Sequence, residues 1–106
     1  MGTTTNKYTP YFPIHPGEIL KDEIEYLGIS QRRLASEMGI SYTLLNEVLN
    51  GIRQVNAELA MLAEAALGLD ADTLVRMQAR YNMQVARQDK TFSERLAKIR
   101  KLTAML

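Results

Sequence analysis

The apolar residues of this chain recur at helical spacing from about residue 14 onward. Positions i, i+3, i+4 and i+7 lie on one face of an α-helix, so the recurrence predicts amphipathic helices that each bury one stripe. The predicted helices span about residues 16–27, 31–38, 42–50, 57–67, 72–88 and 91–106. We therefore expect an all-α protein, with a five-helix repressor-like helix-turn-helix domain and an additional amphipathic C-terminal helix.

The stretch from Ser30 to Gly51 predicts two short helices joined by a tight turn. Ser30 is placed to cap the first helix, Gly39 to end it in the left-handed conformation, and Ser41 to cap the second. So short a turn forces a steep crossing, and Ala35 supplies the small side chain that a close crossing needs. Two helices arranged in this way form the outline of a DNA-binding helix-turn-helix.

The second helix of this pair separates apolar from polar positions. Its apolar positions predict one buried stripe, formed by Leu45, Val48, Leu49 and Ile52. Its opposite face offers hydroxyl and amide groups that can meet base edges in the major groove. That face carries Tyr42, Thr43, Asn46 and Asn50, with Ser41 at its tip and Glu47 at its edge. We expect double-stranded DNA as the partner, and the alternative is an ordinary helical hairpin that binds nothing.

The remaining segments are expected to complete the core. In the first helix Pro16 suits the opening turn, Gly28 ends the helix, and the buried stripe is Leu20, Ile24 and Leu27. Asn56 is expected to cap the fourth helix, whose apolar positions are Leu59, Leu62, Ala63, Ala66 and Leu67. Asp70 or Asp72 is expected to begin the fifth, with a stripe of Leu74, Met77, Tyr81 and Val85.

The last segment is an amphipathic helix without an assigned partner. A capping box from Thr91 to Glu94 is expected to open it. Its apolar face is Phe92, Leu96, Ile99, Leu102 and Leu106, and its basic face carries Arg95, Lys98 and Lys101. Such a helix needs a surface to cover it. Four candidates are open: the core of the same chain, a second subunit, a protein ligand or, through the basic face, a phosphate backbone.

Composition excludes several classes of site. The chain has 106 residues, no cysteine and one histidine, so disulfides, thiolate metal sites and multi-histidine metal sites cannot form within it. His15 is expected to be a capping or surface residue without a chemical role. We expect no cofactor, no metal and no enzymatic activity, because no convergent set of nucleophile, base and anion site is visible. No apolar run is long enough to span a membrane, and a cytoplasmic protein is expected.

Net charge is close to zero, at +1. Residues 1–55 carry five basic and six acidic side chains, whereas positive charge collects at the C-terminus. A DNA-binding surface must therefore be a local patch, with Arg32, Arg33 and Arg53 near the groove and acidic side chains turned away. Specific binding by one such patch is modest, which points to a homodimer.

The motif is more restrictive than a helix-turn-helix outline. The combination of Gln31, Ala35, Gly39, Leu45, Val48 and the closing Asn50-Gly51 resembles the phage-repressor-like (XRE) family. Three further runs are similar to the HigA-type antitoxins, and they cover residues 14–20, 28–35 and 78–82. This resemblance implies a five-helix domain that dimerises, binds an operator in its own promoter, represses the operon and neutralises a HigB-type toxin, a ribosome-dependent mRNA-cleaving nuclease.

The resemblance also implies a role for each motif residue. Gln31 would contact phosphate and buttress the recognition helix. The residues that would face the bases are Ser41, Tyr42, Thr43 and Asn46. Those that would contact the DNA backbone are Arg32, Asn50 and Arg53.

Three regions are expected along the chain. Residues 1–13 form an N-terminal arm, residues 14–69 the DNA-binding core, and residues 70–106 the C-terminal helices that serve dimerisation or partner binding. Two other functions remain open. One is a solitary transcriptional regulator without a toxin, and the other is a protein-interaction module in which the C-terminal helix binds the ligand.

Overall fold

The structure, a computed structural model, describes residues 13–105. The predicted arm up to residue 12 and Leu106 lie outside the described residues. The described chain is helical, with no strand, and consists of α1 (Pro16–Leu27), α2 (Gln31–Met38), α3 (Tyr42–Leu49), α4 (Ala57–Leu67), α5 (Ala71–Gln88) and α6 (Lys90–Ala104). The expected all-α class is confirmed.

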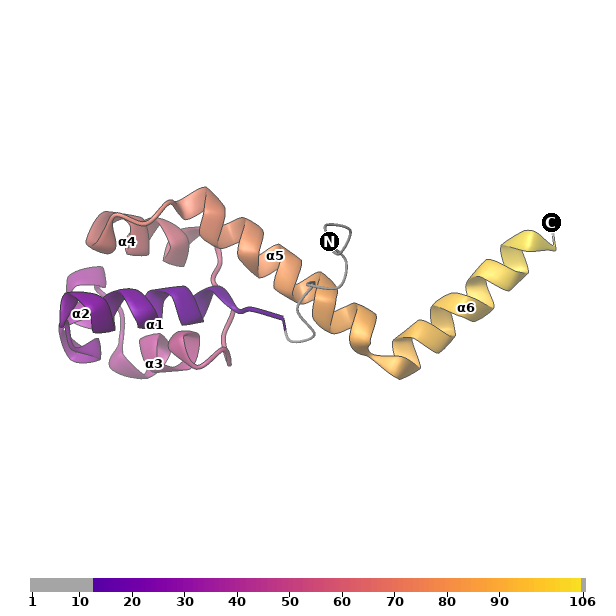
Figure 1. Ribbon diagram of the computed structural model, residues 1–106, viewed down its shortest axis with the longest axis horizontal. Coiled ribbons are helices and arrows are strands. Elements are labelled where there is room, and N and C mark those ends of the chain that lie inside the picture. The colour runs from indigo at the N-terminus through magenta and orange to yellow at the C-terminus, as the bar shows by residue number, and fades with distance from the viewer. Residues whose placement is uncertain (1–12, 106) are drawn as a thin grey trace, which may run out of the picture.

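The hydrophobic core lies where α1 to α4 meet the first turns of α5 (Figure 1). Its largest fully buried apolar side chains are Leu20, Leu34, Leu45, Val48, Leu49, Val55 and Leu74. Ala35 is buried as expected between α2 and its neighbours. Gly17 allows a second close approach, because a Cβ there would collide with the carbonyl oxygen of Val48. These contacts hold α1 and α2 directly against α3.

Local capping fixes the start of each helix in the helix-turn-helix. The Ser30 hydroxyl accepts a hydrogen bond from the Arg33 N–H at 3.1 Å, and the Ser41 hydroxyl accepts one from the Leu44 N–H at 3.0 Å. Gly39 has a φ of 71°, the left-handed conformation that the sequence predicts for it. The turn between α2 and α3 is therefore set by residues that act locally.

Two helix starts refine the sequence expectations. Asp70 caps α5 by accepting from the Thr73 N–H at 2.9 Å, which decides between the two aspartates. The capping box at Thr91 is wrong, because α6 begins at Lys90 and the Asp89 carboxylate accepts the Phe92 N–H at 3.0 Å. Asp89 thus closes α5 and opens α6 at one sharp corner (Figure 1).

Several predicted core positions are exposed instead. Ile52 is 76% exposed because α3 ends at Leu49 and the chain then turns through Gly51, so Ile52 leaves the helical stripe. Leu27 ends α1 beyond the reach of the core, and Val85 lies on the part of α5 that has left it. Ala66 is exposed on α4 as well. A periodic pattern of apolar residues identifies the buried face of a helix. How many of those residues are buried depends on where the helix ends and where it leaves the core.

The C-terminal helices form an arm that extends away from the core. The radius of gyration is 17.8 Å, compared with about 13 Å for a compact chain of this length. Figure 1 shows α5 leaving the cluster of α1 to α4 and α6 continuing beyond the corner, away from the core. Within residues 13–105, no helix has the length and apolar character needed to cross a membrane.

Candidate nucleic-acid interface

The eight predicted site residues lie on α2, α3 and the loop after α3. Gln31 and Arg32 open α2, Ser41 caps α3, Tyr42, Thr43 and Asn46 lie on it, Asn50 is its C-cap, and Arg53 follows in the loop. Ser41, Tyr42 and Thr43 are all exposed, so the first turn of α3 presents an open polar surface. The Ser41 oxygen already accepts the capping hydrogen bond, which leaves its hydroxyl proton to be donated.

Three side-chain amides join α2 to α3. Asn50 Nδ2 donates to Asn46 Oδ1 at 3.2 Å and to the Asn46 carbonyl oxygen at 2.9 Å. Asn46 Nδ2 in turn donates to Gln31 Oε1 at 3.0 Å. Asn46 is half-buried, so these bonds fix the orientation of its amide before any ligand arrives. A fixed amide on the polar face of a helix suits the paired donor and acceptor of an adenine edge.

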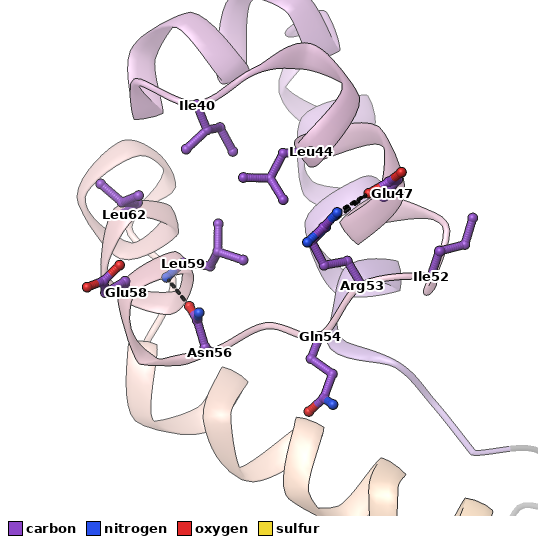
Figure 2. A pocket seen from close by; sticks show the side chains of 10 residues that line it. All are labelled: Ile40, Leu44, Glu47, Ile52, Arg53, Gln54, Asn56, Glu58, Leu59 and Leu62. Atoms are coloured by element: carbon purple, nitrogen blue, oxygen red, sulfur yellow. Dashed lines mark hydrogen bonds and ion pairs between the residues drawn. The ribbon is translucent and has the colours of Figure 1, made fainter.

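The two arginines among the eight site residues have internal partners, and Arg33, also expected near the groove, pairs with Glu37 on its own helix. The Arg32 guanidinium lies over the Tyr42 ring, 4.7 Å from its centroid, which ties α2 to the first turn of α3. Arg53 forms an ion pair with Glu47 on α3, with distances of 2.9 Å and 2.7 Å from two of its nitrogens to one carboxylate oxygen (Figure 2). The Glu47 carboxylate occupies two of the guanidinium nitrogens of Arg53, and the third nitrogen has hydrogen-bond donors left for another ligand.

The loop that carries Arg53 is held by α5. The buried Val55 N–H donates to Gln78 Oε1 at 2.8 Å. Gln78 Nε2 donates to Asn82 Oδ1 at 3.0 Å, and Asn82 Nδ2 donates to Gln54 Oε1 at 3.1 Å. Gln78 is only 4% exposed. No role was expected for Gln78 or Asn82, because a buried amide side chain on a helix resembles an exposed one in the sequence until its partner is known.

His15 holds the same loop from α1. Its Nδ1 accepts the Gly17 N–H at 2.9 Å, so the expected capping role is confirmed, but the ring is buried rather than at the surface. The ring also hydrogen-bonds to the backbone of Arg53 and meets the Tyr81 ring edge-on at 4.9 Å. Burial lowers the pKa of His15 below its usual value, against the opposing effects of Glu18 and of the Arg53 backbone.

The described residues hold no group of three histidine or carboxylate side chains that could bind a metal ion. What the site presents is a row of hydrogen-bonding groups on a capped helix. It is flanked by Arg32, which lies over the Tyr42 ring, and by Arg53, whose charge is offset by Glu47.

Comparison with known proteins identifies the family. The sequence pattern of the helix-turn-helix family matches residues 20–74, more than half of the chain. The chain belongs to the helix-turn-helix family. A relative of this chain, virulence-associated protein I of Dichelobacter nodosus, is 36% identical over 78 residues, which are 73% of this chain and 72% of the relative.

Two solved structures extend the likeness of this helix-turn-helix protein beyond the motif. An addiction module antidote protein of a HigA family from Coxiella burnetii is 30% identical, with a TM-score of 0.72 over 82% of this chain and 94% of that one. The Pseudomonas aeruginosa antitoxin HigA with the higBA promoter is 31% identical, with a TM-score of 0.66 over 70% and 82%. The predicted similarity to HigA-type antitoxins is confirmed.

Proposed function

We propose that this chain is a sequence-specific DNA-binding antitoxin, which represses its own operon and neutralises a HigB-type, ribosome-dependent mRNA-cleaving toxin. The amide row from Asn50 through Asn46 to Gln31 is the observation that carries the DNA-reading part. It orients donors and acceptors on α3 without a ligand, which lowers the entropic cost of binding. The relative whose structure includes a promoter supports DNA as the partner.

Each site residue then has a stated role. Asn46 and Thr43 read base edges from the middle of the exposed face, together with Ser41 and Tyr42. Gln31 buttresses Asn46 and contacts a phosphate. The three remaining side chains, Arg32, Asn50 and Arg53, contact the DNA backbone and set the register of the protein on the duplex.

The proposed division of the chain follows from these roles. Residues 14–69 read DNA, and residues 70–106 serve dimerisation or partner binding. Two copies bind a palindrome with recognition helices one turn of duplex apart, roughly 34 Å. The toxin part of the proposal rests on the likeness to HigA-family antidote proteins. The exposed apolar face of α6 favours a second candidate, in which the C-terminal helix binds a protein ligand.

Base reading and backbone contact are separable by mutation. Asn46→Ala should reduce the preference for operator over random DNA by about 1 to 3 kcal/mol, because one oriented amide is lost. Arg53→Ala should weaken binding to both duplexes alike. It should also reduce by about 1 the slope of log affinity against log salt concentration, because one phosphate contact is lost. Gln84→Ala, on α5 outside the interface, is the control. Competition binding on operator and random duplexes measures all three, and equal losses on both duplexes for Asn46→Ala would contradict its assigned role.

A further inference from the structure

The apolar face of α6 is only partly covered by the chain itself. It is formed by Phe92, Leu96, Ile99 and Leu102, which recur at spacings of four, three and three. Leu96 is half-buried, whereas Phe92 and Ile99 are exposed and Leu102 is 62% exposed. Residues at i, i+4 and i+7 are the anchors with which an amphipathic helix enters an apolar groove.

The core carries a groove of matching character. It is open, has a volume of about 810 Å³, and lies between α3, the loop after α3 and α4 (Figure 2). Its apolar lining is Ile40, Leu44, Ile52, Leu59 and Leu62. Glu58 lies at the α4 edge, where it takes part in neither of the two ion pairs among residues 13–105, and Glu47 lies at the α3 edge with Arg53. The groove therefore has an apolar floor, an acidic edge at Glu58 and an ion pair at the opposite edge.

The charges of the two regions are opposite. Residues 13–86 carry ten acidic and six basic side chains, for a net charge of −4, whereas residues 87–105 carry two acidic and six basic side chains, for +4. Arg95, Lys98 and Lys101 lie beside the apolar face of α6. Opposite net charges favour association of an arm with a core, and like charges oppose association of two arms.

We propose that α6 of one copy lies in the groove between α3 and α4 of a second copy, and that the exchange is reciprocal. This arrangement specifies the surface of the dimer in the proposed function and rests on it. A second copy is the occupant because α6 is directed away from its own core at the Asp89 corner (Figure 1). A reciprocal exchange buries the same two surfaces twice, as two-fold symmetry requires.

Thiol crosslinking tests the contact directly, because the chain has no cysteine of its own. Ile52→Cys places a thiol in the groove and Leu102→Cys places one on α6, both at exposed positions that leave the core intact. With a short bifunctional thiol reagent, the mixture of the two variants should give a crosslinked dimer, and neither variant alone should. A dimer from Leu102→Cys alone would show that arms pair with arms and would overturn the proposal. So would a mixture that does not crosslink while sedimentation reports a dimer.

Charge exchange provides a second test. Glu58→Lys and Lys98→Glu should each weaken self-association about fivefold, as for loss of an exposed ion pair. An equimolar mixture of the two should recover wild-type association, since each altered edge then meets an altered arm. Tyr26→Lys, at an exposed position on α1, is the control and should change little. Failure of the mixture to recover would contradict the assigned pairing.

Both tests are made without DNA, so their failure is distinct from failure of the DNA-reading proposal. If the mixed variants failed to crosslink but still bound the operator, the proposed exchange of α6 would be overturned and the DNA-reading proposal would stand. A protein that sedimentation shows to be monomeric at every concentration would also overturn the exchange. If Lys98→Glu then lowered DNA affinity, the basic face of α6 would be a contact to phosphate instead.

Discussion

The core and the arm use the same sequence pattern but differ in what covers their apolar faces. In the core, Leu45 has no exposed surface because α1 and α2 pack against α3 and Leu45 belongs to the buried cluster. In the arm, Leu102 belongs to an equally regular stripe and is 62% exposed. An amphipathic pattern therefore identifies the apolar face of a helix, but it does not identify the surface that covers this face. For the core the cover is the same chain, and for α6 the cover that we propose is the groove of a second copy.

Truncating one leucine in each region should give the largest contrast. Leu45→Ala should lower the free energy of unfolding by about 2 to 5 kcal/mol, because it opens a cavity among packed side chains. Leu102→Ala should change it by less than about 0.5 kcal/mol in the dilute monomer. Chemical denaturation followed by circular dichroism measures both. Equal losses would mean that α6 packs on its own core.

The glutamine of α5 that reaches into the core should have an intermediate effect. Gln78→Met keeps the volume but leaves the buried Val55 N–H without its acceptor, which should cost about 1 to 3 kcal/mol of stability. It should also loosen the loop that carries Arg53 and weaken binding to any DNA. Gln84→Met is the matched control on the same helix.

A double-mutant cycle separates positioning from stability. If Gln78 acts by positioning the loop, Arg53→Ala should weaken DNA binding less in the Gln78→Met background than in the wild type. Additive losses on DNA would show that Gln78 supports only the fold.

The smallest effect is expected from pH. Because burial lowers the pKa of His15 in the folded state, the unfolded chain binds more protons once the pH falls below the ordinary value of about 6.5. Stability from this residue is therefore fully present above that pH and is lost as the pH falls from it through the lowered pKa of the folded state. His15→Asn keeps a capping side chain without a titrating ring. Its unfolding free energy should depend less on pH between about 7 and 5, and an unchanged dependence would contradict the assignment.

Local signals predicted most of the fold and the place of the candidate site. Ser30, Gly39 and Ser41 act within one turn of their own helices, so their roles are visible in the sequence. Ile52 was misplaced because the end of α3 at Leu49 depends on how the loop packs. The bonds from His15 and Gln78 to the loop after α3 join residues far apart in sequence, and no local pattern reveals them.

Binding of the purified protein to the DNA just upstream of its own gene tests the central claim most directly. The assay uses two salt concentrations, with random DNA as competitor. A sequence-specific repressor should bind tightly, resist the competitor and weaken as salt rises, because phosphate contacts release counterions. Binding no tighter than to random DNA, at either salt concentration, would contradict the assignment of α3 as a DNA-reading helix.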